Sequence, residues 1–152
     1  MRQNPSLQDI QHNMKPGSLS AHGFLGDDMR NLADILSEDD SVVRKLDTTH
    51  KALADRMHYF TQCGKKGLGG PVIVDDIYEV VVEEYRGLIS CPFRDHYRAA
   101  KKNTRITSLK TGQTVFWTDL NTHMICSHGF YEGRGSYFRI NPEELAVILG
   151  MV

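Results

Sequence analysis

Residues 105–118 read RITSLKTGQTVFWT, two β-branched and aromatic runs on either side of Thr111-Gly112. Glycine at the second position of a short loop suits a tight hairpin turn whose twist matches that of the flanking strands. We therefore predict an antiparallel hairpin with one strand over 105–110 and the other over 113–118. Strands that are adjacent in sequence favour hairpins over crossovers, so the whole sheet is expected to be mainly antiparallel.

Upstream of this hairpin, a glycine-rich stretch separates a helical part of the chain from a strand-rich part. Residues 64–71 read GKKGLGGP, which cannot continue a helix without a large cost. After it come VIV at 72–74 and YEVVVEE at 78–84, in which apolar and acidic residues alternate. Such alternation of β-branched residues is typical of half-buried strands.

The N-terminal part predicts two helices. Asp27 and Asp28 are suited to capping a short amphipathic helix that runs to Leu36, and the acidic run at 38–40 is expected to break it. A second helix is predicted from there to about Thr61. It has one apolar stripe, made of Val43, Leu46, His50, Leu53, Met57 and Phe60.

The C-terminal part predicts two more helices. Asp119 can cap a helix that runs to His128, where Gly129 is placed to end it in the left-handed conformation. Asn141 followed by Pro142 and two glutamates is a strong start signal for a helix over 142–149.

These elements predict an α+β fold: two N-terminal helices packed on a small, mainly antiparallel sheet, with a short helix after the hairpin and a C-terminal helix. We expect one domain over residues 24–152, with a helical part at 27–63 and a mixed strand and helix part at 71–152. Residues 1–23 combine polar residues with Pro5, Pro16 and Gly17, and are expected to form a flexible N-terminal arm.

Composition places the chain among ordinary globular proteins. Its 152 residues are 40% hydrophobic, and their formal net charge is −1, so nucleic acid is an unlikely partner on charge alone. Three widely spaced cysteines favour reduced thiols, and no apolar block long enough for a signal peptide or a membrane span is present. A cytoplasmic protein is therefore expected.

Charge is distributed in two opposed blocks. Residues 94–110 contain six basic side chains and one acidic one, Asp95, whereas residues 75–84 contain five acidic side chains and no basic one. The blocks can face each other within the fold or across a dimer, and the basic block could also lie in a solvated surface. Together with the long apolar stripe of the second helix, they favour a homo-oligomer, most simply a dimer.

A metal site is the sharpest chemical hypothesis. Residues 123–128 read HMICSH, and on a helix His123 and Cys126 lie about 60° apart, whereas His128 lies about 140° from His123. A zinc ion held by this segment would therefore need further ligands from elsewhere. The predicted zinc ligands are Cys91, His96, His123 and Cys126; the alternative is that these are ordinary capping and core-edge residues.

The first hypothesis for the function is a small binding or regulatory module whose partner is an unidentified small molecule or protein. A metal-assisted or histidine-dependent hydrolase is the second hypothesis, and a nucleic-acid-binding accessory protein that uses residues 94–110 is the third. No motif with the spacing of a nucleophile elbow or a phosphate loop is present, and no cofactor other than zinc is suggested. The candidate ligand-binding residues are His123, His128, Arg134 and Arg139.

Overall fold

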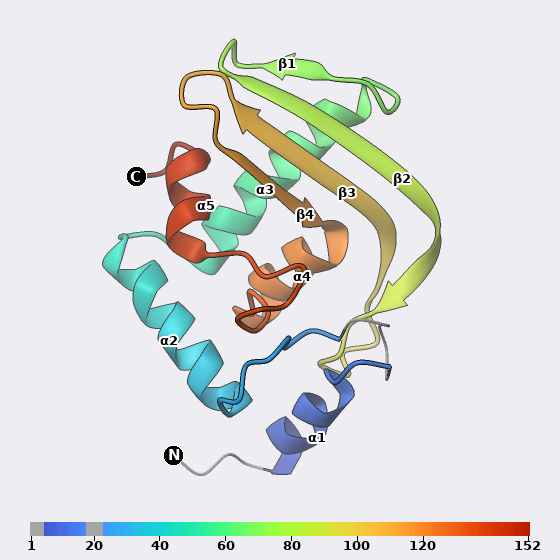
Figure 1. Cartoon of the computed structure of the whole chain (residues 1–152), viewed down its shortest axis with the longest axis vertical. Coiled ribbons are helices and arrows are strands. Elements are labelled where there is room, and N and C mark those ends of the chain that lie inside the picture. The colour runs from blue at the N-terminus through green and yellow to red at the C-terminus, as the bar shows by residue number, and fades with distance from the viewer. Residues whose placement is uncertain (1–4, 18–22) are drawn as a thin grey trace.

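The computed structural model describes residues 5–17 and 23–152, which form five helices and one four-stranded sheet (Figure 1). The elements are α1 (Pro5–Asn13), α2 (Leu32–Lys45), α3 (His50–Lys65), β1 (Val72–Val74), β2 (Tyr78–Ser90), β3 (Arg98–Ser108), β4 (Thr114–Thr118), α4 (Asp119–His128) and α5 (Pro142–Ile148). The strands lie in sequence order, and each neighbouring pair is antiparallel. The predicted α+β class is confirmed.

The predicted hairpin is β3 and β4, but its turn is longer and its first strand begins earlier than expected. Thr107 pairs with Thr114, so residues 109–113 form the connection, and Gly112 has the positive φ of 75° that the turn requires. β3 already begins at Arg98 because it pairs along most of β2, with Val80 opposite Ile106. This long partner extends the strand beyond the local hairpin signal.

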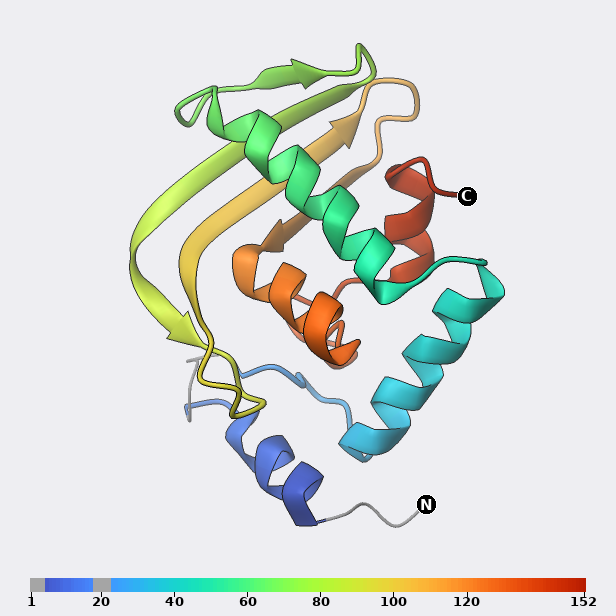
Figure 2. The same cartoon turned by 180° about the vertical axis from the view of Figure 1, so that it is seen from behind.

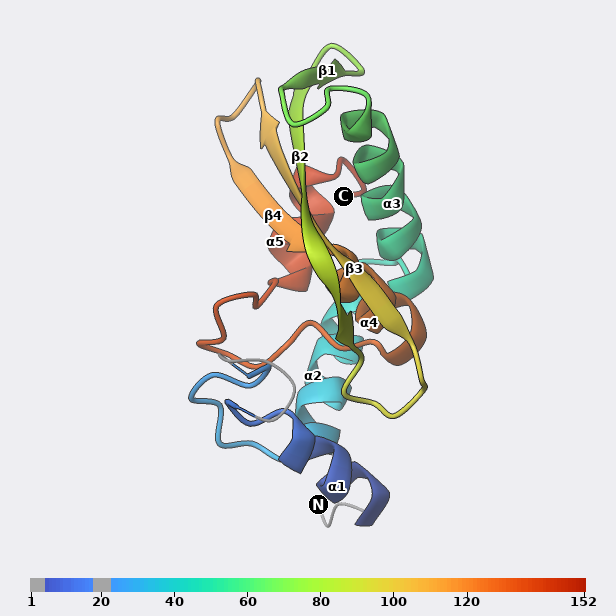
Figure 3. The same ribbon diagram turned by 90° about the vertical axis from the view of Figure 1, so that its right-hand side faces the viewer.

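Helices α3 and α4 lie side by side on one face of the sheet (Figures 2 and 3). The alternation along β2 turns Val80 and Val82 into the core, where they meet the apolar face of α3. Leu53, Met57 and Phe60 of α3 are fully buried there. The predicted stripe is divided between α2, which carries Val43, and α3, and its apolar α3 residues are buried within the fold. This removes one of the two observations that favoured a dimer.

Close packing between α3 and β2 depends on Gly64. A Cβ atom at this position would lie 2.6 Å from Val80 Cγ1 and 2.6 Å from Val82 Cγ2. We expect Gly64→Ala to lower the free energy of unfolding by about 1–2 kcal/mol, because overpacking outweighs the gain in helix propensity. Urea denaturation measures this. Adding Val82→Ala should cost less in the Gly64→Ala background than in the wild type; equal costs in both backgrounds would contradict the packing argument.

The acidic run at 38–40 lies inside α2, so the prediction that it breaks the helix is wrong. Each carboxylate has a basic partner from outside the run: Glu38 pairs with Arg30 and Arg134, Asp39 with Arg139, and Asp40 with Arg44 and His50. One local pair within α2, between Asp40 and Arg44, and several tertiary ion pairs together neutralise the run. The helix instead ends at Lys45, and the Thr49 hydroxyl caps α3 by accepting a hydrogen bond from the Ala52 amide. The start of α2 also differs, because its N-cap is Asn31 rather than Asp27 or Asp28.

Part of the predicted N-terminal arm, residues 5–13, forms helix α1; residues 1–4 and 18–22 lie outside the described residues. Ile10 and Met14 are buried in a second apolar cluster with Leu32 and Ile35 of α2. The Gln11 side chain accepts a hydrogen bond from the Leu32 amide at 3.0 Å. A helix of nine residues depends on such contacts rather than on its own propensity, which is why the local pattern did not indicate it.

Strands β2 and β3 form a curved ribbon that carries their connecting loop, residues 91–97, to the region between α1 and α4 (Figure 1). A register shift between Tyr85 and Leu88, with Gly87 at a φ of 104°, interrupts the ribbon. Parts of the two charge blocks lie on these neighbouring strands, where Glu84 is opposite Lys102 and forms an ion pair with it at 3.8 Å. This pair lies within the fold, which is one of the two arrangements expected for the blocks.

None of the described helices combines the length and the apolar character that a membrane crossing needs.

Candidate metal centre

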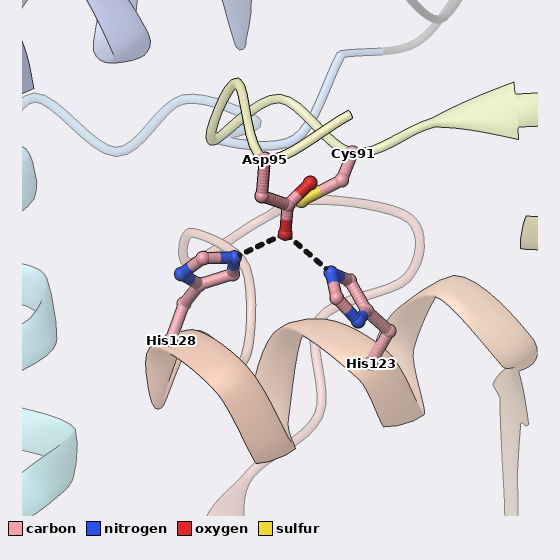
Figure 4. A group of neighbouring side chains, drawn as sticks. All are labelled: Cys91, Asp95, His123 and His128. Atoms are coloured by element: carbon pink, nitrogen blue, oxygen red, sulfur yellow. Dashed lines mark hydrogen bonds and ion pairs between the residues drawn. The ribbon is translucent and has the colours of Figure 1, made fainter. Parts of the chain in front are cut away.

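Four side chains from two elements converge at the end of the β2–β3 ribbon (Figure 4). Cys91 and Asp95 come from the 91–97 loop, and His123 and His128 come from α4. One potential ligand atom from each residue lies within 4.8 Å of those of the other three. Among the described residues, this is the one such group of histidine, cysteine and carboxylate side chains.

The loop holds Asp95 over α4 by its own backbone. The Cys91 amide donates a hydrogen bond to the Tyr97 carbonyl at 2.9 Å and closes the loop. Arg94 and His96, on either side of Asp95, have positive φ values of 60° and 63°. The Tyr97 amide then donates to Asp95 Oδ1 at 3.0 Å, so the second oxygen, Oδ2, is left to face the helix.

Helix α4 presents two imidazoles to that oxygen. His123 Nε2 lies 2.6 Å and His128 Nε2 lies 2.8 Å from Asp95 Oδ2. Aromatic rings of the loop hold both imidazoles in place: Tyr97 stacks on His123 with ring centroids 3.7 Å apart, and Phe93 stacks on His128 at 4.1 Å. Two side chains of α4 are thus clamped between a carboxylate and the flat rings of one loop.

The ends of α4 are well defined, which fixes where the two histidines lie. Thr118 and Asn121 form a capping box at its start, as the Thr118 hydroxyl accepts from the Asn121 amide at 3.0 Å. Gly129 ends the helix with a φ of 62°, as predicted, directly after His128. The helix begins one residue earlier than predicted, at Asp119, because Thr118 rather than Asp119 is the capping residue.

The charge of the cluster is set by burial and hydrogen bonds. Burial raises the pKa of the Asp95 carboxyl, but hydrogen bonds from His128, the Tyr97 amide, His123 and the Cys91 thiol outweigh it and hold this pKa well below its usual range. Desolvation raises the pKa of the Cys91 thiol to about 12. The group therefore contains an ionised carboxylate and, without a metal, a neutral thiol.

Two imidazole nitrogens, one carboxylate oxygen and one sulfur are a donor set that zinc accepts. The donors of a tetrahedral zinc site with bonds of about 2.0–2.3 Å lie about 3.3–3.7 Å apart. The histidine nitrogens are closer to Asp95 Oδ2 than this, at 2.6 Å and 2.8 Å. An ion at the centre of the group would therefore replace both hydrogen bonds. The histidine nitrogens would move away from Asp95 Oδ2 by less than about 1 Å, and donors that lie farther apart, by up to 4.8 Å, would move together.

The structure unites two of the four predicted zinc ligands, Cys91 and His123, and separates the other two from them. His96 is exposed and lines a surface depression, and Cys126 is exposed on α4. Asp95 and His128 take their places. The helical angle of about 140° had argued against His123 and His128 acting together. It constrains the Cα–Cβ directions, whereas both side chains bend toward a carboxylate that lies above the last turns (Figure 4).

The two predicted ligand-binding arginines pair with carboxylates of α2. Arg139 forms a bidentate ion pair with Asp39 at 2.7 Å and 2.9 Å, and it donates to the Glu132 carbonyl at 2.8 Å. Arg134 pairs with Glu38 at 2.6 Å. Both arginines therefore tie the 129–140 segment to α2, and neither takes part in the cluster around Asp95.

His128 had been named as a candidate ligand-binding residue rather than a metal ligand, and a sequence signal for Asp95, which was missed, was present but weak. Asp95 is the single acidic residue in the basic block, and it follows Cys91 by four positions, between two predicted strands. Loops that join strands at the edge of a fold are common places for ligands.

Comparison with protein-family models, with curated proteins and with solved structures finds no significant match to this chain. The interpretation of the cluster consequently depends on its own geometry and chemistry.

Proposed function

We propose that this protein is a binding or regulatory module built around one zinc ion, which Cys91, Asp95, His123 and His128 hold. One observation carries the proposal: four donor atoms lie within 4.8 Å of one another, although they come from a loop and a helix that are far apart in sequence. Exposed acidic groups gather on many proteins without a metal, but here a buried cysteine and two clamped imidazoles accompany the carboxylate.

The number of donors favours a structural or regulatory zinc over a catalytic one. Catalytic zinc sites have three protein ligands and keep a fourth position open for water or substrate, whereas four protein ligands close a tetrahedral shell. The four side chains of the cluster fill that shell. A hydrolase that activates water on this ion is therefore the weaker of the two readings.

The ion would act by joining the 91–97 loop to α4. Without the ion, two hydrogen bonds from histidines of α4 to Asp95 and ring stacking hold the loop to the helix. With the ion, two ligands from the loop and two from α4 bind the same metal. The loop also forms the wall of a depression of about 480 Å³, lined by Asn13 of the α1 end and by Arg94, His96 and Arg98. Zinc occupancy would thus set the shape of a basic surface that a partner could contact.

We expect protein purified without chelator to contain about one zinc ion per chain by elemental analysis. Cys91→Ser and His123→Ala should each weaken zinc binding by more than about tenfold in a competition titration with a chromophoric chelator, because each removes one of four ligands. Cobalt(II) in place of zinc tests the thiolate directly: a sulfur-to-cobalt charge-transfer band is expected in the wild type and absent in Cys91→Ser.

Two neighbours provide matched controls. Cys126→Ser removes the exposed thiol of α4, and His96→Ala removes the imidazole next to Asp95; both should keep zinc affinity and the cobalt spectrum of the wild type. A wild type that binds no zinc and gains no thermal stability when zinc is added would overturn the proposal. So would loss of binding in Cys126→Ser with Cys91→Ser unaffected.

A further inference from the structure

A second site lies away from the metal donors, in a pocket of about 210 Å³ between the β2–β3 ribbon and the 129–140 segment. Its wall is mostly apolar, with Phe24, Ile89, Leu120 and Phe138 among the residues that line it. Of the ionisable side chains that line it, Glu132 is the buried one, at 2% exposure, whereas Tyr85 and Lys101 are exposed. A small apolar pocket with one buried polar group is the usual form of a small-molecule site.

Glu132 is held firmly in this position. The Asn121 side-chain amide donates to Oε2 at 2.7 Å, and the Ser136 hydroxyl donates to Oε1 at 2.9 Å. Glu132 itself has a positive φ of 70°, a conformation that a side chain rarely adopts and that the surrounding packing must maintain. Both oxygens are thus oriented by neutral donors, and each retains acceptor capacity for a further hydrogen bond.

The carboxylate has no cation as a direct partner among the residues that the structure describes. Arg139 contacts only the Glu132 carbonyl, and its guanidinium is committed to Asp39. Lys101 also lines the pocket, but it is an exposed residue, so water screens the charge of its ammonium group. Burial consequently raises the pKa of the Glu132 carboxyl to about 7. A buried carboxylate without a counter-ion is costly, and a bound cation would remove that cost.

We infer that this pocket binds a small apolar amine, with its ammonium group on Glu132 and its hydrocarbon body against Phe24, Leu120 and Phe138. The aromatic rings suit both parts of such a ligand, since their faces attract cations and their area covers hydrocarbon. An anionic ligand would meet an uncompensated negative charge. A neutral apolar ligand would fill the pocket but leave the carboxylate without a partner. The inference does not depend on the zinc proposal, because no metal donor lines the pocket.

The test compares 2-phenylethylamine with 2-phenylethanol, which has the same body without the charge, by calorimetric and NMR titration of the full chain at about pH 8. The amine should bind at least about tenfold more tightly than the alcohol. Glu132→Gln should abolish this preference. Glutamine can still accept from Asn121 and donate to Ser136, so the fold is expected to survive, and thermal unfolding checks that it does.

Phe138→Ala provides the second variant, because Phe138 is only half-buried and its loss should weaken both ligands together. Equal affinity for amine and alcohol, an amine preference that persists in Glu132→Gln, or absence of binding of both compounds to the wild type would each overturn the inference.

Discussion

Asp39→Ala is expected to lower the free energy of unfolding by about 3–5 kcal/mol, as is typical when one partner of a buried ion pair is removed. The Asp39 side chain is 5% exposed, and its two oxygens accept hydrogen bonds from Arg139 at 2.7 Å and 2.9 Å. The alanine variant leaves the guanidinium, 16% exposed, without its counter-charge. Denaturant unfolding followed by circular dichroism measures the loss.

Two controls separate burial from charge. Arg134→Ala breaks an ion pair between the same two segments, α2 and residues 129–140, but the Arg134 side chain is 62% exposed and that of Glu38 is 48% exposed. This variant should lose less than about 1 kcal/mol. Arg139→Met in the Asp39→Ala background should restore part of the stability, because it removes the stranded charge. Similar losses in Asp39→Ala and Arg134→Ala would refute the buried-pair account.

The second large effect is a fall in stability between about pH 5 and pH 8 that originates in Glu132. Burial raises the pKa of this carboxyl from 4.5 to about 7 in the folded protein. Between these values the folded state binds more protons than the unfolded state, so the free energy of unfolding decreases as pH rises. At 1.36 kcal/mol per pKa unit, the whole decrease is on the order of 3 kcal/mol.

Glu132→Gln should remove this slope, since glutamine does not titrate. The informative quantity is the difference between the unfolding free energies of the wild type and the variant across the pH range, in which all other titrating groups cancel. As pH rises, the unfolding free energy of the variant is therefore expected to increase relative to that of the wild type. Asp28 and Asp95 have pKa values below their usual range, so the stability that they contribute is lost only in more acidic solution. If the unfolding free energies of wild type and variant ran parallel across the pH range, the pKa of Glu132 would not be raised by folding.

Elements with strong local signals could be predicted from the sequence. Helix α5 is capped by Asn141, whose side chain accepts hydrogen bonds from the Glu143 and Glu144 backbone amides, and it begins with Pro142, as the pattern indicates. Helix α4 ends at Gly129 because only a residue tolerant of positive φ continues the chain there without strain. These signals depend on hydrogen bonds and dihedral angles within a few residues, so the tertiary environment changes them little.

Elements whose stability comes from partners distant in sequence could not be predicted from the sequence. Two residues of the acidic run that α2 contains, Glu38 and Asp39, are neutralised by Arg134 and Arg139, about a hundred residues away in sequence. Helix α1 is stabilised by its contacts with α2. A window of neighbouring residues includes neither partner, and in both cases the local preference is weaker than the tertiary contact.

For the candidate metal centre, the sequence by itself indicated histidine and cysteine donors and two of the four residues, Cys91 and His123, but not the carboxylate. The tertiary structure decided the other two. Asp95 becomes a ligand candidate only because the β2–β3 ribbon carries its loop over α4, and His128 because its side chain bends toward that carboxylate. Spacing along a helix determines where side chains start, whereas a metal centre depends on where their ends meet, and this depends on the packing of elements that are distant in sequence.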